Sequence, residues 1–152
     1  MLELRPVVAD DLPQLFEHQS DPEAARMAAF PPRDRDAFYA HWGRIMHDPS
    51  LLALTVTEGT DVLGYVASFD SDGMRLIGYW IGRSHWGKGI GRSAVSLLLE
   101  RETRRPLHAH VVRTNLASIR ILEACGFRAI GSSAAAAATG GDVVEELTFR
   151  LD

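Results

Sequence analysis

The sequence is poor in cysteine, in long apolar runs and in positive charge. Its single cysteine, Cys125, cannot form an intrachain disulfide, which favours a reducing compartment. No apolar stretch approaches the ~20 residues that cross a bilayer, and the opening MLELRPVVADDL lacks the apolar run and cleavage site of a secretory signal. A net charge of -4 argues against nucleic-acid binding, which requires a basic face. We therefore expect a cytoplasmic protein with neither nucleic acid nor membrane as a partner.

The chain has the size and composition of one globular domain. Its 152 residues are 46% hydrophobic and 24% charged, which are ordinary values for a soluble protein. Apolar residues recur with helical spacing in some segments and alternate in others, which predicts an α/β fold. We expect about four helices on both faces of one mixed, mostly antiparallel sheet of about seven strands. The expected strands are residues 2–7, 52–56, 63–69, 74–82, 107–112, 127–130 and 143–151.

The predicted helices flank a central run of three strands. The first begins near Asp10 as its cap, and the second covers residues 38–46. The third covers residues 91–105, and the fourth follows Asn115 as its cap. The strand at 107–112 comes after a crossover helix, so we expect it to run parallel to the strand before that helix.

Two segments carry weak patterns. Residues 22–32 receive no assignment, because Pro31 and Pro32 stop any helix before them. Residues 132–141 contain five consecutive alanines between serines and glycines, which offer little to bury. We expect this second segment to be a loop without chemical function.

The most informative segment is the glycine-rich run WGKGIG, residues 86–91. Its glycines alternate into a predicted helix, so backbone N–H groups can approach an anion at the positive helix end. A dinucleotide fold would need an acidic residue about 20 positions later, where the sequence reads HAHVV. A magnesium-binding Walker loop would need Ser or Thr after Lys88, where Gly89 stands. A third candidate ligand is acetyl-CoA, whose pyrophosphate needs amides but no metal.

At this point the chain resembles the GNAT acetyltransferase superfamily, especially the branch that acetylates ribosomal-protein N-termini and related small amines. Gly89 and Gly91 match the glycines of the family pattern Q/R-x-x-G-x-G/A, while Trp86 replaces its opening Gln or Arg. A second block, NLASIRILEACGF from Asn115, is similar to the family's N-x-x-S…G-F helix. The resemblance covers nearly the whole chain, specifically from residue 64 to residue 127.

The resemblance implies one GNAT domain over residues 1–152 that uses acetyl-CoA and no metal. It places the pantetheine arm between the strands at 74–81 and 107–112, where the two strands separate. Main-chain N–H groups near Trp80 and Ile81 would then polarise the thioester carbonyl. The cofactor-binding residues implied are Trp80, Ile81, Trp86, Gly87, Lys88, Gly89, Ile90, Gly91, Arg92, Asn115 and Ser118.

Direct transfer to an amine needs a base for the ammonium and an acid for the departing thiolate. Family members with a clear acid carry Tyr seven residues after the Asn, where this chain has Leu122. Ser118 or a bound water is the substitute. The base is His110, where some members carry Glu, or its rival Glu145. Tyr79 is expected to contact the acceptor.

We therefore expect an acetyl-CoA-dependent N-acetyltransferase acting on a primary amine of a small molecule, peptide or protein, with a homodimer implied by the resemblance. Two alternatives stay open. The missing tyrosine would suit a degenerate GNAT domain that binds acyl-CoA as a sensor or interaction module. The near-match to a Walker loop leaves a P-loop phosphotransferase as a minor third possibility.

Overall fold

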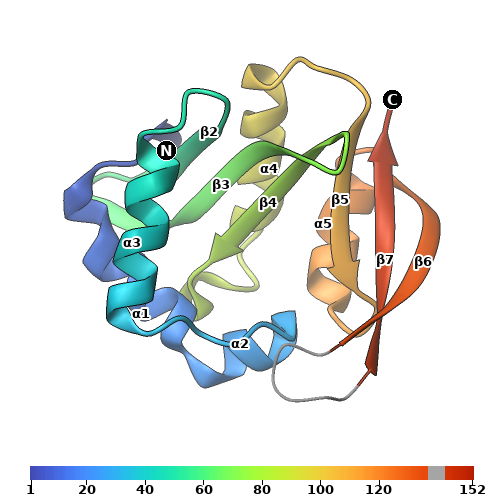
Figure 1. Ribbon diagram of the computed structural model, residues 1–152. Helices are drawn as coiled ribbons and strands as arrows, with labels where there is room; N and C mark the ends of the chain where they lie inside the picture. The colour runs from blue at the N-terminus through green and yellow to red at the C-terminus, as the bar shows by residue number, and fades with distance from the viewer. Residues whose placement is uncertain (137–142) are drawn as a thin grey trace.

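The computed structural model describes residues 1–136 and 143–152 and has one seven-stranded mixed sheet with the strand order β1-β2-β3-β4-β5-β7-β6 (Figure 1). Among the described strands, β4 and β5 are parallel and the other neighbours are antiparallel. The strands are β1 (Leu2–Pro6), β2 (Leu52–Glu58), β3 (Asp61–Ser71), β4 (Met74–Ile81), β5 (Leu107–Val112), β6 (Arg128–Ala136) and β7 (Val143–Leu151). The helices are α1 (Leu12–Ser20), α2 (Pro22–Ala28), α3 (Arg35–Met46), α4 (Ile90–Arg101) and α5 (Leu116–Ala124).

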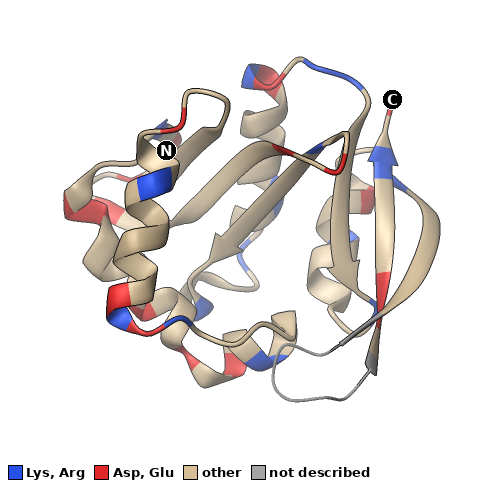
Figure 2. Cartoon of the chain, in the orientation of Figure 1, with Lys and Arg blue, Asp and Glu red and all other residues tan. Residues whose placement is uncertain are grey.

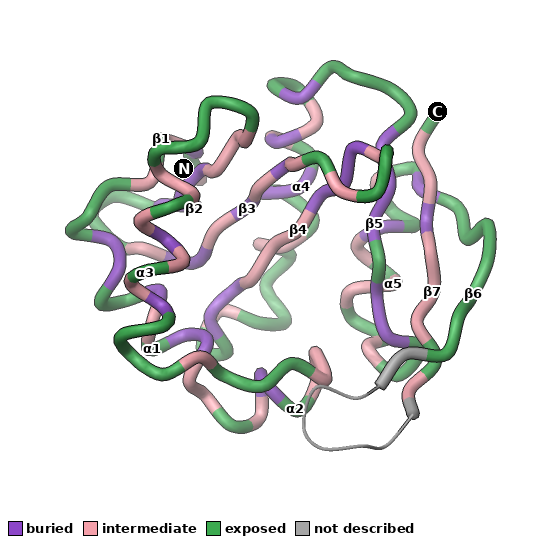
Figure 3. The backbone as a smooth tube through the Cα atoms, viewed as in Figure 1, coloured by how far each residue is buried: buried purple, intermediate pink, exposed green. Residues whose placement is uncertain are grey.

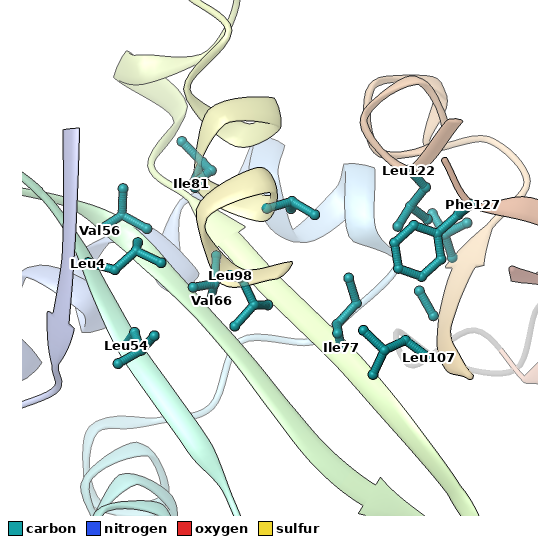
Figure 4. Close-up of a cluster of buried hydrophobic side chains, with 14 of the residues drawn as sticks. Leu4, Leu54, Val56, Val66, Ile77, Ile81, Leu98, Leu107, Leu122 and Phe127 are labelled. Atoms are coloured by element: carbon teal, nitrogen blue, oxygen red, sulfur yellow. The ribbon is translucent and has the colours of Figure 1, made fainter. Parts of the chain in front are cut away.

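Helices cover both faces of the sheet, as predicted. The larger core lies under α4 and α5, where Leu98 and Leu122 pack with sheet residues such as Val66 and Ile77 (Figure 4). The smaller core lies under α1 and α3 and contains Leu12, Leu15, Phe38 and Trp42. The expected α/β sandwich with a mixed sheet is therefore confirmed.

β4 and β5 diverge soon after they meet. They pair only at Arg75 with Leu107 and at Leu76 with His108. Beyond this point β4 continues to Ile81 with β3 on one edge, and its other edge has no strand partner in the described residues. The sheet thus opens toward the carboxyl ends of both strands.

A buried ion pair closes the opposite end of this opening. Arg75 Nε lies 2.7 Å from Glu102 Oε1, and Ser68 Oγ donates to the same carboxylate at 2.9 Å. Burial alone would raise the pKa of Glu102, but the hydrogen bonds from Arg75, Arg104 and Ser68 outweigh it and lower the pKa to about 2. α4 ends at Arg101, four residues before the predicted end, and Glu102 follows it with an extended backbone.

Three other boundaries differ from prediction. α2 forms within the unassigned segment and adds a fifth helix. Its cap Asp21 accepts a hydrogen bond from the Ala24 N–H, and the helix ends at Ala28, followed by Ala29 in the left-handed conformation before the two prolines. A 3-10 turn precedes α1, so Asp11 rather than Asp10 stands at its N-cap position, and the Asp11 side chain makes no capping hydrogen bond there. β1 ends at Pro6.

The prediction of a loop from residue 132 was wrong for its first half. β6 runs to Ala136 and pairs with β7, with Ala134 opposite Glu145. Backbone hydrogen bonds hold this edge strand without help from large side chains, and its residues from Arg128 to Ala134 are exposed (Figure 3). Residues 137–141 of the predicted loop lie outside the described residues.

Charged residues of both signs are interspersed over the helices and strand ends (Figure 2). Among the helices of the described ranges, none combines the length and apolar composition that crossing a membrane requires. The same ranges contain no group of three or more His, Cys, Asp or Glu residues suited to a metal ion.

Candidate active site

A cavity of about 430 Å³ lies beside the open end of β4. Four parts of the chain form its walls: the end of β4 with the loop that follows it, the start of α4, the start of α5, and α2. Its lining residues include Tyr79, Trp80, Ile81, His85, Trp86, Gly87, Gly89, Ile90, Gly91, Arg92, Asn115 and Ser118. Most of the predicted cofactor residues therefore lie around one cavity; Lys88 belongs to the same loop but is not among the lining residues.

The glycine-rich loop needs its glycines for two different reasons. Gly87 and Gly89 both have φ of 75°, a left-handed conformation that other residues rarely adopt. Gly89 is also the N-cap of α4, so the first amides of this helix face outward without a side chain in front of them. At Gly91, a Cβ atom would lie 2.6 Å from Ile121 Cδ1, so glycine lets α4 approach α5 closely. The result is a helix N-terminus with accessible N–H groups, a site for an anion.

Trp86 ties this loop to the sheet. Its indole N–H donates to the Ile81 carbonyl oxygen at 2.9 Å. In the family pattern a Gln or Arg stands here, and Trp86 supplies an anchoring contact within the chain instead. Two arginines, Arg92 of α4 and Arg120 of α5, also line the cavity.

Tyr79 of β4 and Ser118 of α5 meet beside the open end of β4. Asn115 caps α5 by accepting a hydrogen bond from the Ser118 N–H at 3.2 Å. The Ser118 hydroxyl lies 2.5 Å from the Tyr79 hydroxyl of β4, 39 positions earlier in the chain. Burial raises the pKa of Tyr79 to about 12. Leu122, where the family's acidic tyrosine would stand, points instead into the core beside Phe127 (Figure 4).

The two candidate bases lie on β5 and β7, and neither is among the residues that line the cavity. His110 is exposed, on the sheet face opposite the buried Ala109 and Val111, and its Nδ1 lies 3.1 Å from Thr148 Oγ1. Glu145 is paired with Arg113, whose Nε and Nη2 lie 2.6 and 2.8 Å from its carboxylate oxygens. The Arg113 hydrogen bond lowers the pKa of Glu145.

Several lining residues were not found by motif reasoning. Ala24, Met27 and Ala28 form an apolar wall contributed by α2. His85 also lines the cavity, with its ring 6.3 Å from that of the buried His18. Burial, then the charge of His85, lowers the pKa of His18 to about 4. These residues come from α1, α2 and a turn, whose placement no local pattern fixes.

The sequence also matches a known family model. The match is to the acetyltransferase (GNAT) domain and spans residues 1–128 of the 152, well over half of the chain. The protein belongs to the GNAT acetyltransferase family. Its α/β fold with a seven-stranded mixed sheet is thus that of a GNAT domain.

Relatives of this GNAT protein cover it almost from end to end. The uncharacterised N-acetyltransferase p20 of Bacillus licheniformis is 28% identical over 144 residues, which is 86% of this chain and 80% of that one. A Vibrio cholerae spermidine N-acetyltransferase, solved with CoA and spermine, has a TM-score of 0.86 at 18% identity, covering 99% of this chain and 94% of its own. A Brucella melitensis ribosomal-protein-alanine N-acetyltransferase has a TM-score of 0.82 at 20% identity, covering 98% of each chain. Similar structures thus come from several acceptor classes, and the ribosomal-protein branch is one among them.

Proposed function

We propose that this GNAT protein is an N-acetyltransferase that moves an acetyl group directly from acetyl-CoA to a primary amine. One observation carries the proposal: an accessible helix N-terminus adjoins a free strand edge within one cavity. The helix N-terminus suits a pyrophosphate, and the strand edge suits the amide groups of a pantetheine arm. The Vibrio cholerae structure with CoA supports the same ligand.

The proposed cofactor position follows from these two features. The pyrophosphate lies on the amides of residues 87–91, near the positive charges of Lys88 and Arg92. The pantetheine arm runs along the free edge of β4, with Asn115 and Ser118 of α5 on its other side. N–H groups near Trp80 and Ile81 polarise the thioester carbonyl and stabilise the oxyanion that forms as the amine attacks.

The candidate acid and the candidate base are proposed for different reasons. Ser118 lines the cavity in the first turn of α5 and is the candidate acid for the thiolate. Neither candidate base lines the cavity, and of the two we propose His110. Glu145 is held by Arg113, and its lowered pKa makes it a poorer proton acceptor.

The acceptor is proposed only as a class, a primary amine of a small molecule or a peptide. Its side of the cavity is formed by Tyr79, Trp80 and the apolar wall of α2. Spermine and a ribosomal-protein alanine are named for relatives that are under 25% identical to this chain and share its fold. The GNAT domain over the full length of the chain, the homodimer and the cytoplasmic location remain predictions.

The test measures binding and turnover separately. Acetyl-CoA at 100 times its Kd should stabilise the protein by about 2.7 kcal/mol, whereas NAD or magnesium-ATP should stabilise it much less. Thiol release from acetyl-CoA is then followed across a panel of amines, amino acids, polyamines and peptides. We expect at least one acceptor to accelerate release, and mass spectrometry should find the acetylated amine. No thermal shift with acetyl-CoA would refute the proposal.

A second function has one observation in its favour. Leu122 is buried in the core, so the position of the family's acid contributes no hydroxyl to the cavity. A GNAT domain that binds acyl-CoA as a sensor or interaction module would show the thermal shift without thiol release by any acceptor.

A further inference from the structure

The geometry points to a proton relay of two hydroxyl groups, in which Tyr79 of β4 supplies, through Ser118 of α5, the proton that the leaving thiolate takes up. This inference rests on the proposed acetyl transfer. It names Tyr79 as a positioning and proton-supplying residue, in addition to its expected contact with the acceptor.

The relay stands first on a contact between two elements. The hydroxyl groups of Tyr79 and Ser118 lie 2.5 Å apart, a short distance for two neutral oxygens. Both residues line the cavity, at the point where β4 and β5 have separated. Tyr79 thus spans from the sheet to the helix that carries the candidate acid.

The contact allows two hydrogen arrangements. In one, Ser118 donates to the Tyr79 oxygen, and Tyr79 donates to the Ser118 carbonyl oxygen, which lies 3.3 Å away. In the other, Tyr79 donates to Ser118 Oγ, and the Ser118 hydrogen is free to point into the cavity. Either oxygen can be the donor at this geometry. Only the second arrangement presents a proton to a ligand, and it is the one that transfers.

The transfer balances as follows. After the amine nitrogen bonds to the carbonyl carbon, the C–S bond breaks and the sulfur leaves with the electron pair. The sulfur takes the proton of Ser118 Oγ, while Oγ takes the proton of Tyr79. Solvent then reprotonates the phenolate, and the base passes one proton from the amine nitrogen to solvent. One proton is lost by nitrogen and one is gained by sulfur, so no further reactant is needed.

A phenol is the better source because it is more acidic than an aliphatic alcohol, which would otherwise have to leave an alkoxide. Burial also keeps the pKa of Tyr79 far above neutral pH, so its proton is present when the thiolate forms. Tyr79 thereby contributes the phenol that Leu122 lacks, from a strand rather than from α5.

The experiment compares Tyr79→Phe, Ser118→Ala and the double variant with Tyr39→Phe, a partly buried tyrosine of α3 outside the cavity. We measure kcat by thiol release, Kd for acetyl-CoA by calorimetry, and Tm. Tyr79→Phe and Ser118→Ala should each lower kcat by roughly 10²-fold or more, with Kd within about twofold of the parent. The kcat of the double variant should lie within about twofold of the lower of the two single-variant kcat values, because the two residues act as one unit. Tyr39→Phe should match the parent protein.

Two results would overturn the relay: a Tyr79→Phe kcat within about threefold of the parent, or single losses that multiply in the double variant. If Tyr79→Phe also lowers Tm or weakens binding, Tyr79→3-fluorotyrosine decides. This change keeps the hydroxyl, so kcat should return to within about threefold of the parent. A kcat as low as that of Tyr79→Phe would overturn the relay. Failure of the proposed function is distinguishable, because the parent protein would then bind acetyl-CoA without turnover.

Discussion

Gly89→Asp tests the position of the cofactor phosphates most directly. Gly89 has φ of 75°, and no heavy atom lies within 4 Å of a Cβ built there. Aspartate is among the residues that tolerate this backbone best, so the fold should survive at a cost of about 1 kcal/mol. Its carboxylate would stand in front of the α4 amides, where the pyrophosphate is proposed to bind.

The expected loss of affinity can be worked from charge alone. A carboxylate about 5 Å from a group of charge -2 is repelled by about 1.7 kcal/mol even at the dielectric constant of water. That energy is roughly a 15-fold increase in Kd, and steric exclusion from the amides adds to it. Calorimetric titration of acetyl-CoA measures the change, with the unfolding free energy measured in urea.

Gly59→Asp is the matched control, because it separates backbone strain from cofactor repulsion. Gly59 has φ of 61° and equally open surroundings, but it lies in the turn between β2 and β3, away from the cavity. Both variants should lose similar stability, and only Gly89→Asp should lose affinity. Unchanged binding by the Gly89 variant would mean that the phosphates lie elsewhere.

Three further predictions follow from contacts and charges. Gly64→Ala would put a Cβ atom 2.1 Å from the Trp80 carbonyl oxygen, so β4 must shift; we expect a loss of about 1–3 kcal/mol in urea denaturation and slower acetyl transfer. Glu102→Gln removes a carboxylate whose folded pKa of about 2 lies below its ordinary 4.5, so its contribution is present above about pH 4.5 and disappears as the pH falls toward 2. The variant should lose up to about 3 kcal/mol at neutral pH and show a flatter acid limb, whereas an unchanged limb would contradict the lowered pKa. His110→Ala should lower kcat by roughly 10²- to 10⁴-fold at nearly unchanged Kd for acetyl-CoA, while Glu145→Gln should have little effect; the reverse result would assign the base to β7.

Much of the fold follows from patterns that are local in the sequence. Alternation predicted the three-strand meander and β7, and the crossover rule predicted that β5 runs parallel to β4. Elements with weak local patterns were misjudged. β6 is held by backbone pairing with β7, which alanine and serine do not reveal. α4 ends four residues early, and the residue that follows it, Glu102, pairs with Arg75, 27 positions away in the chain.

The candidate site also has one part that local sequence patterns predict and one part that they do not. The anion-binding part depends on consecutive residues, and the family motif contains them together. Left-handed glycines at positions 87 and 89 and the cap of α4 are local requirements, so the sequence could predict them. The proton-transfer part depends on side chains brought together from separate elements. Tyr79 and Ser118 are 39 positions apart, and no spacing rule links a strand residue to the first turn of a later helix.

In the proposed relay, the position of the Tyr79–Ser118 contact would compensate for the missing tyrosine of α5. β4 and β5 stop pairing after Leu76, so side chains of β4 beyond that point can reach α5 across the gap. Tyr79 is the β4 residue that does so, and its hydroxyl meets the helix one turn before Leu122. Substitution of leucine at 122 extends the apolar core beneath α5, while a hydroxyl pair remains on the cavity side. The opening in which we propose that the cofactor binds would also give Tyr79 access to the reacting sulfur, and the loss of kcat in Tyr79→Phe measures how much of the rate depends on it.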